Sequence, residues 1–368
     1  MQQEREHIYP HIITYKQLCE DDYELEDDKY DIAKFVVTES AIKMLTNNPI
    51  ISEDDKTVLY FKIVDGIIGG RVLIFGTRLK LDNQILVCGS GSSLKVAEPF
   101  RHLGLGADIM TYMTFNSGYD IIIAAGISKI ALPLYKVLKY SIFEFPQLTC
   151  FYNSRSLLEH YGIHGCFLKF LLSLANIPFR LFKIMQIRKS RILQEQFELK
   201  REDLVPEWID AIVLKDGHKY CEVHDHKWFQ WNLDNQLTLH NQYKSSFFCI
   251  YKEGRPLGFF FTKEKWQGAI GSLQNVLKGF ISEWGSVNEK LLSELDIYIL
   301  ALSTFSNKVE LIYVGTPCES TLKGLKKMGF INNGTCNIAV KGNKKKYNDF
   351  GNIKQWRIRS GYGDTMLY

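Results

Sequence analysis

The sequence lacks the signatures of several common classes of protein. Its eight cysteines are scattered and include no C-x-x-C pair, which argues against a zinc or disulfide framework and favours a reducing compartment. The net charge is only +4, too small to indicate a nucleic-acid binder. The first residues, M-Q-Q-E-R-E-H, lack signal-peptide character. We therefore expect a cytoplasmic protein with no nucleic-acid partner and no metal.

Two glycine signatures are also missing. No strand is followed by the three-glycine dinucleotide fingerprint, and no G-K-[ST] completes a phosphate-binding P-loop. The apolar strand that begins at Gln84 leads instead into R-x-x-G-x-G, made by Arg101, Gly104 and Gly106. Helical spacing then runs from Ala107 to Phe115. A glycine loop that opens a helix leaves backbone N–H groups unpaired, and these predict an anion site suited to a pyrophosphate.

The order of the next elements extends this pattern. A short buried strand spans 121–125, a second helix spans 129–140, and extended character returns over 143–151. This order resembles the GNAT superfamily of acyl-CoA N-acyltransferases, whose L-Y-x-x-x-G-F signature corresponds here to Leu134, Tyr135, Lys139 and Tyr140. The resemblance covers residues 58–151. It departs at Pro99, one place later than usual, and at Lys139-Tyr140, which replaces Gly-Phe at the helix end.

The resemblance implies a site for acetyl-CoA as co-substrate. The loop would bind the pyrophosphate, and the strand before it, splayed from its neighbour, would pair with the pantetheine arm. The implied coenzyme-binding residues are Lys95, Val96, Ala97, Arg101, His102, Leu103, Gly104, Leu105 and Gly106. Tyr135 would protonate the departing thiolate, because a phenol keeps its proton at neutral pH.

The general base stays open. The strand before the loop carries no carboxylate, so the candidates are Glu98 and Glu144 nearby in sequence, with Asp225 and Glu283 from the second half. The pattern H-D-H at 224–226 offers two histidines without a third ligand, which argues against a metal site. The aromatic and amide run W-F-Q-W-N-L-D-N at 228–235 suits either sugar or peptide contact or core packing.

The chain also contains an internal repeat at an offset of 188–190 residues. D-G-I-I-G-G at 65–70 matches E-G-R-P-L-G at 253–258, and two later segments match in the same order. We therefore predict an α/β fold of two tandem GNAT-like domains, each a mixed, mostly antiparallel sheet flanked by helices. The predicted parts are a catalytic domain (1–155), a helical linker (156–200) and a degenerate, acceptor-binding domain (201–368).

The second copy differs where chemistry would occur. It has no R-x-x-G-x-G over 282–292, and Leu325 stands in place of the tyrosine. We expect one coenzyme site per chain. The apolar and basic segment 166–191 is interrupted by charged and polar residues, so it is not a transmembrane helix. It is either a packed linker or a peripheral membrane contact. The tail from Trp356 reads as a closing strand and polar turn without an assigned role.

These features predict an N-acyltransferase that moves an acetyl group from coenzyme A to a primary amine. The acceptor would be a small amine-bearing molecule or sugar, such as an amino sugar or a precursor of cell-surface polysaccharide. Two alternatives remain. One is a Fem-like transferase that uses aminoacyl-tRNA, against which the intact loop argues. The other is a module that binds acyl-CoA without turnover, which the missing strand carboxylate keeps open.

Overall fold

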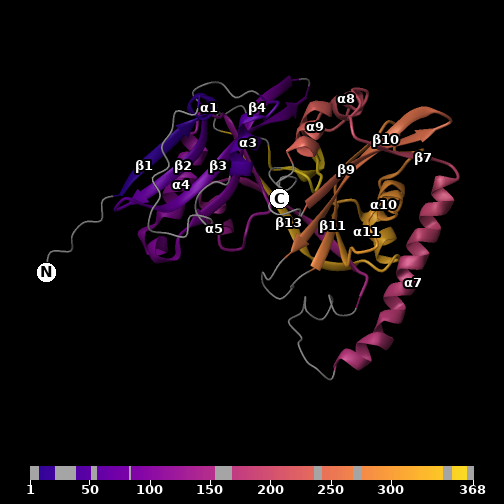
Figure 1. Ribbon diagram of the computed structural model, residues 1–368. Helices are drawn as coiled ribbons and strands as arrows, with labels where there is room; N and C mark the ends of the chain where they lie inside the picture. Colours follow the sequence, from indigo (N-terminus) through magenta and orange to yellow (C-terminus); the bar gives the residue numbers. More distant parts are fainter. Residues whose placement is uncertain are drawn as a thin grey trace.

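The computed structural model describes residues 8–20, 39–50, 56–82, 84–153, 168–235, 243–267, 276–342 and 350–362. One mixed sheet of 14 strands runs through both halves of the chain (Figure 1). Its main path has the order β1-β2-β3-β4-β5-β13-β6-β12-β11-β10-β9-β7. The predicted α/β class with a mixed, mostly antiparallel sheet is confirmed.

The predicted repeat appears as two copies of nearly the same element order; β8 has no counterpart in the first copy, and η1 has none in the second. The first copy contains β1 (Ile8–Thr14), α1 (Tyr15–Cys19), α3 (Glu39–Thr46), β2 (Thr57–Val64), β3 (Ile67–Leu81), β4 (Gln84–Val96), η1 (Glu98–Leu103), α4 (Leu105–Phe115), β5 (Ile121–Ala125), α5 (Leu132–Val137) and β6 (Ser141–Phe151). The second contains β7 (Glu198–Glu202), α8 (Ile209–Leu214), β8 (Tyr220–Glu222), α9 (His226–Asp234), β9 (Tyr243–Lys252), β10 (Arg255–Gln267), β11 (Val276–Ser286), α10 (Glu294–Leu302), β12 (Leu311–Gly315), α11 (Glu319–Lys326) and β13 (Ile331–Gly342).

Helix α7 (Leu168–Gln194) connects the two copies. After β13, η3 (Ile353–Gln355) leads into β14 (Trp356–Arg357), the closing strand expected in the tail. β14 pairs with β8, and β8 pairs with β3 of the first copy. The end of the described chain therefore returns to the junction between the two copies.

The two copies exchange their last strands. β6 of the first copy pairs with β12 and β13, and β13 of the second copy pairs with β5. Neither copy thus completes its own sheet. The domain boundaries near 155 and 200 stay a prediction, but the strand pairing joins the regions on both sides of them into one sheet.

The symmetry of the repeat is visible at side-chain level. Asn47 Nδ2 donates to Asn235 Oδ1 at 3.2 Å, and these residues are 188 positions apart. Trp231 Nε1 donates to Met44 O at 3.0 Å across 187 positions. Equivalent positions can touch each other only near the axis that relates the copies. A pseudo-twofold axis therefore passes between α3 and α9.

Alternation along the strands separates two cores. Tyr60, Val72 and Ile74 face α4 and α5, whereas Phe61 and Phe75 face α1, α3, α8 and α9. The second core also contains Phe247, Phe259 and Phe261 from the far side of the sheet. The sheet must therefore curve around α3 and α9. Trp228, Phe229 and Trp231 are buried in this core, so packing, not ligand contact, explains the aromatic run at 228–235.

Tertiary contacts set the length of β4. Only its first residues have strand-forming character, yet β4 continues through G-S-G-S-S to Val96. A Cβ at Gly89 would lie 2.7 Å from the Tyr119 ring, and one at Gly91 would meet Met113 Sδ. These glycines let α4 and Tyr119 pack directly on the strand, which overrides their weak strand propensity. Conversely, α5 is shorter than the predicted helix 129–140.

Candidate functional site

The site begins where β4 and β5 separate. These parallel strands share only the pairs Gly89↔Ile122 and Ser90↔Ile123. Beyond Ser90, β4 stays paired with β3, and a bulge there places Ser93 at φ +51°. A bulge bends its strand, so the edge of β4 facing β5 is left open. The splayed strand that the resemblance implied is present.

The loop after β4 presents its backbone to solvent. Ala97 N–H bonds to Gly69 O, η1 comes next with Pro99 in its first turn, and Gly104 adopts the left-handed conformation at φ +72°. The first bonds of α4 run from the N–H groups of Ala107 and Asp108 to Gly104 O. The N–H groups that precede them, at the start of the helix, are the ones that an anion can use.

The predicted coenzyme residues divide into two groups. Four are exposed: Lys95, Arg101, His102 and Gly104. The others are partly or fully buried, and Ala97 and Leu105 anchor the loop with only 1% exposure. No atom lies within 4 Å of a Cβ built on Gly104. The loop thus offers an open, glycine-lined approach beside the cationic side chain of Arg101.

An ion pair lies at the N-terminal end of α4. Asp108, in the first turn of α4, lies 3.0 Å from Lys62 Nζ of β2. Burial opposes the charge on Lys62, but the carboxylate of Asp108 outweighs it and raises the pKa of the lysine. The positive charge of Lys62 therefore balances the negative charge that Asp108 brings to the N-terminus of α4.

Tyr135 lies on the helix beside this loop. Its ring is 5% exposed and meets the ring of Tyr140 edge-on, with centroids 4.9 Å apart. Leu134, the preceding residue, lies 3.8 Å from a Cβ built on Gly106, and Val96 lies 3.6 Å from it. Helix α5 therefore packs against the start of α4, where the end of β4 also packs.

Strand β13 of the second copy completes this side of the site. Asn337 accepts from Ile127 N–H at 2.7 Å and donates to Ile127 O at 3.2 Å. Ile127 lies just after β5 and belongs to the same apolar cluster as Tyr135. Sequence reasoning missed Asn337, because the two residues are 210 positions apart. Ser90 was missed too: its buried hydroxyl has no hydrogen-bond partner among the described residues.

The equivalent helix end of the second copy is closed. β11 and β12 also separate, after the pair Phe280↔Tyr313. The next helix, α10, is capped by a box in which Ser293 Oγ accepts from Asp296 N–H and the Asp296 carboxylate accepts from Ser293 N–H. Glu294 adds a further acid to the first turn. The box thus occupies the N–H groups of Ser293 and Asp296, and two acids in the first turn would repel phosphates.

A buried ionic cluster lies at the junction of the copies. Its centre is His224, whose Nδ1 is 3.0 Å from Glu283 Oε2 and whose Nε2 is 3.6 Å from Glu222 Oε1. Arg357 lies 3.3 Å from Glu283 and 3.3 Å from Asp216. The members come from segments far apart in the chain, so the sequence indicates Glu283 only as a candidate base and His224 only in the H-D-H pattern.

Contacts within the cluster set the charge states of His224 and Glu283. Burial lowers the pKa of His224, but the carboxylates of Glu222 and Glu283 outweigh this and raise it to about 9. Burial raises the pKa of Glu283, but Arg357 and His224 bring it below its ordinary value. The cluster therefore holds an imidazolium between carboxylates at neutral pH. No group of three or more His, Cys, Asp or Glu in the described ranges could hold a metal ion.

The four candidate bases have different surroundings. Glu283 is held in the buried cluster, and Asp225 caps α9 and pairs with Arg78 at 2.5 Å. Glu98 lies on the loop, 86% exposed and 3.9 Å from Arg101. Glu144 of β6 is exposed and lines a cavity. Of the four, Glu144 is the carboxylate that is open to a cavity.

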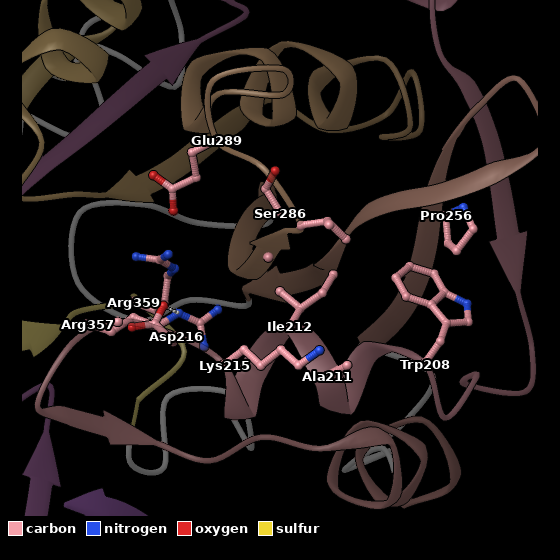
Figure 2. A pocket seen from close by; sticks show the side chains of 13 residues that line it. Trp208, Ala211, Ile212, Lys215, Asp216, Pro256, Ser286, Glu289, Arg357 and Arg359 are labelled. Atoms are coloured by element: carbon pink, nitrogen blue, oxygen red, sulfur yellow. Dashed lines mark ion pairs between the residues drawn. The ribbon is translucent and has the colours of Figure 1, made fainter. Parts of the chain in front are cut away.

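Two cavities that share lining residues lie on the side of the second copy. The larger, about 770 Å³, is lined by β6 and by the helix ends and closing strand of the second copy. Its lining includes Glu144, Trp284, Ser293, Ser320, Thr321 and Trp356. The smaller, about 350 Å³, lies between α8, β11 and the closing segment, and Figure 2 shows Arg357, paired with Asp216, and Arg359 at one side of it. Glu289 and Arg359 line both.

The element order and the split strand pair give the chain the two-copy, GNAT-like fold that the sequence resemblance predicted. No protein-family model matches the sequence, and no curated protein matches it significantly. Among solved structures, Saccharomyces cerevisiae N-myristoyltransferase with bound myristoyl-CoA superposes with a TM-score of 0.55 at 11% identity, over 90% of this chain and 82% of that one. The same yeast enzyme with myristoyl-CoA and inhibitors gives 0.56 at 13% identity, over 91% and 80%.

A bacterial structure shares the fold as well. A protein of unknown function from Enterococcus faecalis V583, described as a probable N-acyltransferase, matches with a TM-score of 0.51 at 11% identity. The match covers 92% of this chain and 72% of that one. At such identities the similarity concerns the fold, and the chemistry has to be argued from the residues of this chain.

Proposed function

We propose that this protein is an N-acyltransferase that takes its acyl group from acyl-coenzyme A. The observation that carries the proposal is the split between β4 and β5, which leads directly into the left-handed Gly104 and the N-terminus of α4. Open strand-edge groups suit the amides of pantetheine, and the helix N-terminus suits the pyrophosphate. The fully buried hydroxyl of Ser90, without a hydrogen-bond partner among the described residues, lies at the last pair that β4 and β5 share.

The reaction needs a proton for the thiolate and removal of a proton from the amine. Tyr135 belongs to the apolar cluster that also contains Leu105 at the start of α4 and receives Val96 from the end of β4, and this position supports its role as the acid. The exposure of Glu144 to the larger cavity supports its role as the base. Strand β13 lies between β5 and β6, so the amine would approach across the last strand of the second copy.

We further propose that the larger cavity receives the acceptor. Its size falls in the range of small-molecule sites, and its hydroxyl, carboxylate and tryptophan side chains suit an amino sugar, with the carboxylates attracting an ammonium group. The acyl group is proposed to be acetyl. The yeast structures contain myristoyl-CoA, so rates measured with a series of acyl-CoA chain lengths would distinguish a short donor from a long one.

The decisive experiment is calorimetry with acetyl-CoA on a Gly104→Val variant. A valine there would obstruct the phosphates, so we expect affinity to fall at least about tenfold, the equivalent of one charge-assisted hydrogen bond. Gly254→Val is the matched control, because Gly254 has φ +73°, also has no atom within 4 Å of a built Cβ, and lies in a distant hairpin. Equal affinity in both variants, with folded protein, would refute the coenzyme site.

A further inference from the structure

The outward face of α7 carries an apolar stripe. Ile177, Leu181 and Ile184 are 53%, 60% and 61% exposed, and Ile192 is 50% exposed. The spacing of the first three, i, i+4 and i+7, places them on one side of the helix. Isolated exposed apolar residues are common, but a row of them on one helix marks an interaction surface.

The opposite face of α7 is already engaged by the fold. Gln186 is buried, and its Nε2 donates to Met328 O at 2.8 Å, while its Oε1 accepts from Tyr152 OH at 2.8 Å. Met185 and Leu193 pack against the core around α10. Figure 1 shows α7 on the outer side of the second half, beyond α10 and α11. The stripe is therefore not used by the contacts that hold the helix.

Positive charge accompanies the stripe. Arg180, Arg188 and Arg191 are exposed and fall on the same side of the helix as the apolar residues. Over its whole length, Leu168–Gln194, the helix has Lys and Arg side chains but no Asp or Glu. A surface of a soluble partner would leave this charge unmatched unless it were acidic, whereas an anionic membrane surface offers both hydrocarbon and negative head groups.

We propose that α7 is an interfacial helix, through which the protein docks on a bilayer that contains anionic lipids. The helix lies in the plane of the membrane with Ile177, Leu181 and Ile184 among the acyl chains and the arginines at the head groups. It does not span: no described helix is long and apolar enough to cross a membrane. The inference does not depend on the coenzyme site, which lies in the other copy.

The test is flotation of the full-length protein with vesicles of phosphatidylcholine, with and without phosphatidylglycerol. We expect binding to the anionic vesicles that weakens with salt. Two variants remove the two components of the surface: Ile177→Ser/Leu181→Ser/Ile184→Ser and Arg180→Gln/Arg188→Gln/Arg191→Gln. Loss of the three charges should lower the partition coefficient about 100-fold, since each is worth about fivefold near an anionic surface. Loss of the apolar stripe should lower it at least about tenfold.

Matched controls replace as many exposed side chains elsewhere. The apolar control is Ile8→Ser/Ile12→Ser/Leu204→Ser, and the charge control is Lys244→Gln/Arg255→Gln/Lys290→Gln. Both should bind like wild type, and thermal unfolding should show that all four variants fold. Absence of vesicle binding, or equal binding by all variants, would overturn the proposal. So would a dimer in sedimentation that the stripe variant dissociates, because a second copy would then cover this face.

Discussion

Tyr135 and Tyr140 are adjacent buried phenols that serve as an internal comparison. Tyr140 OH lies 2.7 Å from Thr114 Oγ1 of α4, and burial raises its pKa. Tyr135 belongs to the helix next to the split strands. If Tyr135 is the acid, Tyr135→Phe should lower kcat about 10²–10⁴-fold with unchanged acetyl-CoA affinity. Tyr140→Phe should lower the melting temperature with kcat nearly unchanged. Similar kcat values in both variants would make Tyr135 structural.

Glu144 is tested with the same assay. The base must be ionised to accept a proton, so the wild-type rate should fall on the acidic side of its pH profile. In Glu144→Gln that acidic limb should disappear and the plateau should drop about 10²-fold or more. A profile that keeps its shape in the variant would move the role of base to another group.

His224 predicts a pH dependence of stability. Its pKa rises from an ordinary 6.5 to about 9 in the folded protein. Because the pKa is higher in the folded protein, the protonated imidazole stabilises the folded state fully below about pH 6.5. This stabilisation is lost as the pH rises through 9. The contribution is on the order of 3 kcal/mol. Urea unfolding of wild type and His224→Gln should therefore give a difference that is large near pH 6 and shrinks towards pH 10. A constant difference would contradict the imidazolium.

At the scale of elements, α4 and α10 are equivalent helices, but their N-termini are capped differently. α4 begins after Gly104 without a side-chain cap, whereas α10 begins with a reciprocal cap between Ser293 and Asp296. The cap of α10 places Asp296 and Glu294 where phosphates would bind, so titration calorimetry should give one coenzyme A per chain. Two equivalent sites would contradict this reasoning.

At the scale of the whole molecule, each copy needs a strand of the other copy to complete its part of the sheet. A fragment that ends at residue 153 would lose β13 from the edge of β5 and both partners of β6. Unpaired edges of this kind favour aggregation, so we expect the fragment to be poorly folded by circular dichroism and without the proposed acyltransferase activity. Co-expression with residues 154–368 should restore a soluble complex. A fragment that folds and transfers acetyl at full rate would show that the exchange is dispensable.

The candidate site could be predicted in part. The sequence predicts Gly104, the loop and Tyr135 as site residues because they lie within 40 residues of one another and match a known order of elements; their roles stay predictions. Asn337, Ser90 and the His224 cluster could not be found this way. Their partners are distant in the chain, and a buried polar residue is indistinguishable from an exposed one until its neighbours are known.

The sequence by itself determined the turns, the periodicity and the repeat. Asp65-Gly66 predicts a hairpin, and both residues adopt positive φ there, because a tight turn depends on residues next to each other. Only the tertiary structure decided that β6 and β13 change places, that β4 extends through its glycines, and that His224 is enclosed by the carboxylates of Glu222 and Glu283. Each of these depends on free energies between segments far apart in the chain, which no local pattern records.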